Sequence, residues 1–137
     1  MGKVETKITL VNVKDAANAE DGFISINDVR KDTVMAIADT GAMSLIIPEE
    51  LFQKLGLTQI GNINANLADG RQLPCKVTSP VIIYWQNRRT TVEAVVIPGA
   101  KRVLLGAIPL EGMDLMVDPV NQTLVGVHGD EVVCTVY

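Results

Sequence analysis

A chain of 137 residues is expected to form one domain, covering residues 1–137, around one hydrophobic core. Its 47% apolar and 20% charged residues are typical of a soluble globular protein. The net charge of −4 argues against a nucleic-acid partner, and no apolar stretch approaches the roughly 18 residues that a membrane-spanning helix needs.

The N-terminus, MGKVETKITL, lacks the apolar core of a secretion signal, which predicts a cytoplasmic location. Its first six residues also fit the loose pattern for N-myristoylation, with Thr6 at the required position. Because so short a pattern also occurs without lipidation, we expect an unmodified start.

Short apolar stretches between turn signals predict an all-β fold. Residues 23–29 alternate apolar and polar side chains, whereas residues 33–38 are almost wholly apolar, as in a strand buried on both faces. The polar residues 14–22 predict a loop. The predicted strands are 7–13, 23–29, 33–38, 43–48, two arms within 63–77, 81–85, 90–97, 103–106, 114–118, 122–127 and 131–137.

One segment, residues 48–55, carries clear helix signals. Pro48 suits a first helical turn, and Glu49 and Glu50 suit the positive end of the helix dipole. Gly56 is a favourable stop. With residues 107–112, which are helical or irregular, the fold is expected to contain one or two short helices.

Two hairpins are predicted after this helix. Asp69-Gly70 is among the strongest hairpin-turn dipeptides and lies at the centre of residues 63–77. The polar turn QNRR, residues 86–89, joins the predicted strands 81–85 and 90–97 and gives the second hairpin. No glycine-rich phosphate-binding pattern is present.

The stretch IADTGAMSLIIP, residues 37–48, places a carboxylate inside an apolar run. A charged group there is costly unless it is paired, hydrogen-bonded or protonated. Asp39 and Gly41 suit a tight turn, because Asp bonds nearby backbone and Gly allows close approach. The letters alone are also consistent with a carboxyl that two rigid strands hold for chemistry.

Other site chemistries have little support. Cys75 and Cys134 are expected to be reduced core residues; a disulfide or a catalytic thiol is the lesser alternative. His128 is the only histidine, which excludes clustered zinc ligands within one chain, and its turn-like context predicts the surface. Asp114 is expected to be solvated and Asp118 to start a turn. We therefore predict no metal and no cofactor.

The chain resembles the retropepsin-like aspartic proteases, and within them the small bacterial and archaeal members. The resemblance rests on MAIADTGAMSLIIP, on LADG, and on VLLGAIPLEGMDLMVDP, in this order. It spans roughly residues 22–127. It implies a single-lobe, closed barrel-like fold and an aspartic endopeptidase. Ala38, in place of a larger apolar residue, and a hairpin with one tip glycine depart from the viral pattern.

The resemblance also implies roles for individual residues. Asp39, Thr40 and Gly41 would form the catalytic triplet, with Thr40 bracing the loops of two copies and Gly41 beside substrate. The predicted substrate-binding residues are Ala42, Leu67, Ala68, Asp69, Gly70 and Arg71, and those supporting the loop from beneath are Leu104, Leu105 and Gly106. For residues 67–71 an ordinary surface hairpin remains the alternative. For residues 104–106 the alternative is an ordinary buried strand that ends in a glycine.

Aspartic protease chemistry needs two carboxyls that share one proton, and this chain has one Asp-Thr-Gly. The resemblance therefore implies a homodimer with its active site on the two-fold axis and a polypeptide substrate. The terminal stretch 131–137 is a candidate for its interface. Two alternatives are a silent dimer that binds extended peptides and a subunit of a larger assembly.

Overall fold

The computed structural model describes residues 3–134. The myristoylation pattern at Gly2 and the last three residues of the strand predicted at 131–137 lie outside the described residues. The strands are β1 (Val4–Asn12), β2 (Lys31–Ala38), β3 (Leu45–Ile47), β4 (Gln59–Asn66), β5 (Gln72–Thr78), β6 (Val81–Trp85), β7 (Arg88–Val92), β8 (Ala94–Val96), β9 (Val103–Leu105), β10 (Leu115–Asp118) and β11 (Thr123–Gly126). The helices are α1 (Val13–Glu20), the 3₁₀ helix η1 (Ile26–Asp28), α2 (Glu49–Lys54) and α3 (Ala107–Gly112).

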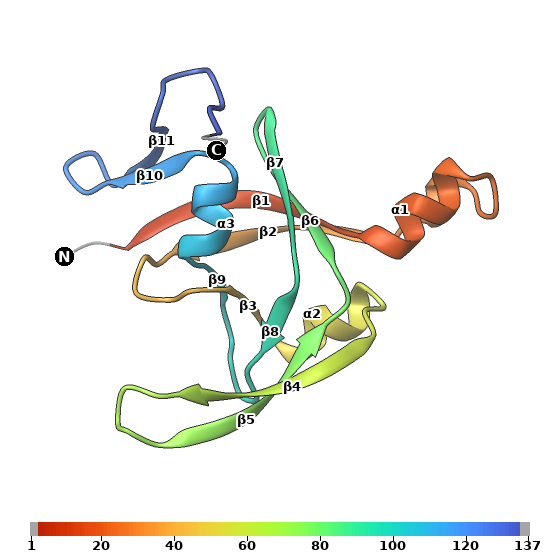
Figure 1. The fold of residues 1–137 in the computed structure, drawn as a ribbon, viewed down its shortest axis with the longest axis horizontal. Helices are drawn as coiled ribbons and strands as arrows, with labels where there is room; N and C mark the ends of the chain where they lie inside the picture. The colour runs from red at the N-terminus through yellow and green to blue at the C-terminus, as the bar shows by residue number, and fades with distance from the viewer. Residues whose placement is uncertain (1–2, 135–137) are drawn as a thin grey trace.

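Nine strands of the described residues form one sheet, in the order β4-β5-β8-β3-β9-β2-β1-β6-β7, and β10 pairs with β11 apart from it. The all-β prediction is therefore confirmed. Within residues 3–134 the sheet ends at β4 and β7, which do not pair with each other, so this part of the chain forms an open rather than a closed sheet. Figure 1 shows the β4–β5 hairpin extending from the body at the lower left, far from α1.

The hydrophobic core draws on most strands of the large sheet. Leu10, Leu45, Ile83 and Leu105 are fully buried and come from β1, β3, β6 and β9. Burying such a side chain contributes about 1.5–3 kcal/mol. The strands on either side of Asp39 are thus held by the same core.

The polar stretch 14–22 forms a helix rather than the predicted loop. Asn12 caps α1, because its side-chain oxygen accepts a hydrogen bond from the N–H of Asp15 at 3.1 Å. The side-chain amide of Asn12 also donates to the carbonyl of Leu55 at 2.8 Å. Alanines at three of the eight helix positions favour the helical state, which a polarity pattern does not reveal.

The prediction of a strand at residues 23–29 is wrong. The chain turns back on α1, where the N–H of Phe23 donates to the carbonyl of Asn18 at 2.8 Å, and then forms η1. Phe23 and Ile26 are each 78% exposed, so their alternation with polar residues marks no buried face. The three α-helices of the described residues exceed the one or two predicted.

Two predictions near other strands also need correction. Residues 90–97 divide, because β7 pairs with β6 whereas β8 pairs with β3 and β5. Residues 131–134 form no strand beyond one bridge between Glu131 and His128. Cys75 is buried as predicted, but Cys134 is exposed.

Candidate active site

Asp39 follows β2 directly and begins a tight, hydrogen-bonded turn. Its N–H donates to the carbonyl of Leu105 at 3.0 Å, and its own carbonyl accepts from the N–H of Ala42 at 3.1 Å. Its Oδ1 accepts from the N–H of Gly41 at 2.9 Å. The sequence left a turn and a chemical role as alternatives; the structure contains the turn, and it leaves the carboxyl half-buried rather than sealed in the core.

The strand β9 lies between β2 and β3 and fixes both ends of this turn. Leu105 is opposite Ala38 in the parallel pair and opposite Leu45 in the antiparallel pair. Leu105 is fully buried, whereas Leu104, on the other face of the strand, borders the space beside Asp39. The predicted supporting residues therefore lie directly behind the Asp39 turn.

Gly106 permits the closest backbone approach in this region. A Cβ there would lie 2.4 Å from the carbonyl oxygen of Ser44 and 2.7 Å from that of Ala42. The N–H of Gly106 donates to Ser44 at 3.1 Å, and the next N–H, of Ala107, donates to Ala42 at 2.8 Å. The glycine after Leu104-Leu105 is thus required by packing against the turn.

A cleft of about 670 Å³ separates the Asp39 turn from the β4–β5 hairpin. Asp39, Gly41 and Ala42 border it on one side, and Leu67 and Ala68 on the other. The remaining lining residues are Met43, Ser44, Ile46, Ile63, Ala65, Asn66, Val95, Ile97 and Leu104. A mostly apolar cleft with one carboxyl is the arrangement expected of a small-molecule or peptide site.

The hairpin tip contributes less to the cleft than predicted. Asp69, Gly70 and Arg71 are exposed and do not border it. Gly70 has a φ of +85°, which glycine adopts without strain, and the N–H of Leu67 donates to the carbonyl of Arg71 at 2.8 Å. Asp69 and Arg71 pair with each other at 2.6 Å. Their role in substrate binding stays a prediction.

Thr40 lies on the opposite side of the turn, exposed to solvent. A second hollow, of about 620 Å³, includes Thr40 together with Val4 and Val117. Asp39 borders both hollows. The carboxyl therefore stands at a ridge between the hairpin cleft and a surface formed by β1, β2 and β10.

A comparison with models of protein families gives a match. The family described as aspartyl protease matches residues 24–118, which include the Asp39 turn, the hairpin and Gly106. The chain belongs to the aspartyl protease family. The expected family resemblance is thus confirmed, and the retropepsin-like fold class is supported by solved structures.

Two solved structures share the fold of this aspartyl protease family member. EIAV protease complexed with the inhibitor HBY-793 matches with a TM-score of 0.52 and 18% identity, covering 80% of this chain and 86% of the other. The retroviral protease-like domain of Ddi1 from Leishmania major matches with a TM-score of 0.57 and 14% identity, covering 96% and 91%. No curated protein matches significantly.

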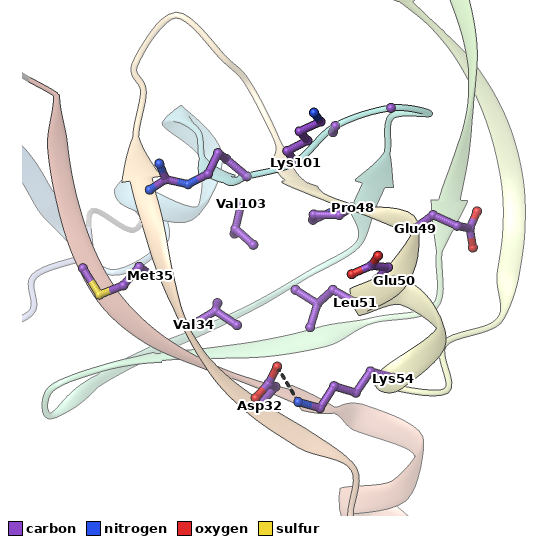
Figure 2. A pocket seen from close by; sticks show the side chains of 13 residues that line it. Asp32, Val34, Met35, Pro48, Glu49, Glu50, Leu51, Lys54, Lys101 and Val103 are labelled. Carbon is purple, nitrogen blue, oxygen red and sulfur yellow. Dashed lines mark ion pairs between the residues drawn. The ribbon is translucent and has the colours of Figure 1, made fainter.

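A further cleft, of about 740 Å³, lies between β2, α2 and the loop 99–102 (Figure 2). Val34 and Leu51 form part of its apolar wall, and Lys54 Nζ pairs with an Asp32 oxygen at 3.1 Å across one end. Asp39 does not border this cleft. We therefore assign this cleft no part in aspartic protease chemistry, although it is large.

Asp114 is held more firmly than its predicted solvated position implied. Its Oδ2 lies 2.7 Å from His128 Nδ1 and accepts from the N–H of Val133 at 3.1 Å. The hydrogen bond with His128 holds the pKa of Asp114 below its ordinary value. His128 is on the surface as predicted, and Asp118 starts a turn by accepting from the N–H of Val120. This cluster fastens the C-terminal segment.

Among residues 3–134 no group of three or more His, Cys, Asp or Glu side chains could hold a metal ion. No helix in the same range is long and apolar enough to cross a membrane.

Several cleft residues were not singled out by sequence. Ile63 and Ala65 share one face of β4 with Leu67, and the alternation NINANL carries that signal. Val95 and Ile97 enter from β8 and the residue after it, beyond the reach of any local pattern. Their place in the cleft depends on the pairing of β8 with both β3 and β5.

Proposed function

We propose that the protein is an aspartic endopeptidase, active as a homodimer, in which each copy supplies one Asp39 carboxyl. The observation that carries the proposal is the Asp39 turn at the edge of an apolar cleft, in a chain that belongs to the aspartyl protease family. The retropepsin-like fold of the chain is consistent with it.

The chemistry follows from two carboxyls at close range. Two like charges cannot both ionise easily at such a distance, so the pair shares one proton. The ionised Asp39 removes a proton from a water molecule, and the protonated one polarises the carbonyl of the scissile peptide bond. Attack by the water gives a tetrahedral intermediate, which breaks down as the leaving nitrogen is protonated.

The second carboxyl has to come from another copy, because Asp39-Thr40-Gly41 is the only such triplet in the sequence. Thr40 is exposed beside the second hollow, which Val4 and Val117 also border. A second copy seated on this side would bring the two turns together and leave the hairpin cleft to the substrate. An isologous two-fold contact meets this requirement.

The hairpin cleft suits a polypeptide in extended form. Its apolar walls come from β4, β8 and β9, and an extended chain there could pair with exposed backbone of the hairpin. We propose that the hairpin closes over the bound peptide as a flap. Leu67 and Ala68 are the tip residues already beside the cleft.

The substitution Asp39→Asn tests the proposal. The amide cannot serve as the general base, so cleavage of a denatured protein between pH 4 and 7 should fall to background. The fold and the dimer should persist by circular dichroism and sedimentation. Asp28→Asn, an exposed carboxyl in η1, is the matched control and should cleave as the wild type does.

Undiminished cleavage by Asp39→Asn would overturn the proposed mechanism. A wild-type protein that forms a dimer and binds extended peptides, but shows no cleavage that a pepstatin-like transition-state mimic inhibits, would instead identify the silent peptide-binding dimer.

A further inference from the structure

The strand β4 forms an open edge of the nine-stranded sheet. It pairs with β5 on one side and has no strand partner on the other within the described residues. Its eight residues, QIGNINAN, contain no charge and no proline. Charged side chains, prolines and β-bulges are among the means by which proteins prevent edge strands from pairing with other chains. From Asn62 to Asn66 this edge carries none of them, and its one register shift lies at its start, between Gln59 and Gly61.

The register of the hairpin decides which backbone groups face outward. The N–H of Leu67 donates to the carbonyl of Arg71, and the carbonyl of Leu67 accepts from the N–H of Gly70, so the backbone groups of Leu67 point inward across the hairpin. In an antiparallel ladder bonded and non-bonded pairs alternate. Ile63 therefore bonds inward to β5, as does Ala65. The N–H and C=O groups of the three alternate asparagines point away from β5 and toward the open edge: Asn62, Asn64 and Asn66.

Proline on the partner strand agrees with this assignment. Pro74 is opposite Asn64 and has no N–H to donate, as a non-bonded pair allows. The side chains of Asn62 and Asn64 are exposed, and they lie on the face opposite Ile63, which borders the Asp39 cleft. The edge thus offers backbone N–H and C=O groups at a repeat of two residues, with the side chain of Asn64 on the exposed face and that of Asn62 accepting from Gln59 Nε2 at 2.7 Å.

This pattern is complementary to itself. In an antiparallel pair about a two-fold axis at Asn64, that residue meets its own copy, and Asn62 meets Asn66. A charged residue at the centre would face a like charge, but an amide both donates and accepts and can pair with its own kind. The nearby Asp69 and Arg71 neutralise each other within one hairpin.

The opposite edge of the sheet differs. The strand β7 begins with Arg88 and Arg89, and α3 packs against it so closely that a Cβ at Gly112 would lie 2.4 Å from Thr90 Oγ1. An antiparallel pair of two β7 strands would have to accommodate the charge of Arg89 and the helix. Self-pairing is therefore favoured at β4 and opposed at β7.

We propose that β4 is an assembly edge, at which a second copy of this chain adds its own β4 in antiparallel register centred on Asn64. The outward backbone groups of the three asparagines then bond across the two-fold axis. This contact uses a different surface from the Asp39 dimer and does not depend on peptidase activity.

Cysteine cross-linking tests the register in the full-length protein. A directly opposite bonded pair places its Cα atoms about 5.5 Å apart, within the range of a disulfide. In a Cys134→Ser background, which removes the exposed natural thiol, Asn64→Cys should give a covalent dimer on mild oxidation. Asn62→Cys is the matched control, because its copies lie about 14 Å apart in this register.

We expect Asn64→Cys to cross-link about tenfold faster than Asn62→Cys or Asn66→Cys alone, given the narrow geometric limits of a disulfide. A mixture of Asn62→Cys and Asn66→Cys should recover rapid cross-linking between the two. Equal rates for all three single variants would mean random collision and would overturn the proposal.

Sedimentation gives a second measurement that needs no disulfide. Asn64→Lys should weaken concentration-dependent association, because the two-fold axis would bring two lysines together. Asn87→Lys, in the exposed turn between β6 and β7, adds the same charge elsewhere and should leave association unchanged. Association that is equally strong in wild type and Asn64→Lys would contradict the assembly edge.

Discussion

Asp39 illustrates how much one side chain depends on its backbone. Its Oδ1 accepts from the N–H of Gly41, and its own N–H is held by Leu105. These bonds orient the carboxyl without pairing it to a cation in the described residues. An aspartate that serves in a proton-sharing dyad needs this combination of fixed position and open partner.

Gly106 is the residue on which this position most depends. Replacing it with alanine would place a Cβ 2.4 Å from the Ser44 carbonyl, so the turn or α3 has to move. We expect Gly106→Ala to lower the free energy of unfolding by about 1–3 kcal/mol and to reduce the kcat/KM for peptide cleavage. Urea unfolding and peptide assays measure the two effects.

The control for this substitution is Gly61→Ala on β4. A Cβ at Gly61 would lie 3.9 Å from Val77, an ordinary contact, so its unfolding free energy should change little. If Gly106→Ala were as stable and as active as the wild type, the close approach of Gly106 to the Ser44 carbonyl would not be needed for folding or for catalysis.

At the level of elements, α1 is joined to the start of β2 by a partly buried ion pair. Asp15 accepts from Arg30 through Nε at 2.8 Å and through Nη2 at 3.0 Å, and the N–H of Arg30 bonds to the same carboxyl. These hydrogen bonds hold the pKa of Asp15 below its ordinary value. The ion pair thus connects the two ends of the segment between β1 and β2, which the sequence patterns had predicted to be a loop followed by a strand.

Because the folded state favours the ionised Asp15, the ion pair stabilises the fold fully above the ordinary pKa of about 3.9. That contribution is lost as the pH falls below this value. We expect Asp15→Asn to cost about 1–2 kcal/mol at pH 7, since Arg30 is half exposed. Urea unfolding at pH 7, 5, 4 and 3 should show the difference from wild type narrowing below pH 4.

Other carboxylates with lowered pKa values, such as Asp114, are present in both proteins and cancel in this comparison. Asp28→Asn, at an exposed carboxyl outside this ion pair, is the control and should unfold at the same urea concentration as the wild type at pH 7. A gap between wild type and Asp15→Asn that stays constant down to pH 3 would contradict the role assigned to the ion pair.

For the whole molecule, the proposed function requires two copies. A dimer with one Asp39 and one substituted chain lacks the dyad and should be inactive. With random exchange, a ninefold excess of Asp39→Asn should leave about one tenth of the wild-type activity. Peptide cleavage at fixed wild-type concentration, after time for subunit exchange, measures this loss.

Addition of albumin at the same mass concentration is the control and should not reduce cleavage. Sedimentation of the mixture would establish that subunits exchange. Full activity in the presence of exchanged, substituted chains would mean that one copy suffices, and the shared dyad would have to be abandoned.

The sequence by itself determined the parts whose signals are local. An apolar strand before Asp39, the Asp69-Gly70 turn and the proline–acid start at residue 48 correctly placed β2, the β4–β5 hairpin and α2. Local chemistry decides such features, because turn residues and helix dipoles act within a few positions.

Only the tertiary structure decided which surfaces meet. The placement of β9 between β2 and β3 explains why Gly106 must be glycine, and the pairing of β8 brings Val95 into the cleft. In segment 14–29 the helix has local causes, the Asn12 cap and three alanines, whereas the return of the chain to β2 is fastened by the ion pair of Asp15 with Arg30. Contacts between residues distant in sequence depend on the packing of the whole chain, which no local pattern encodes.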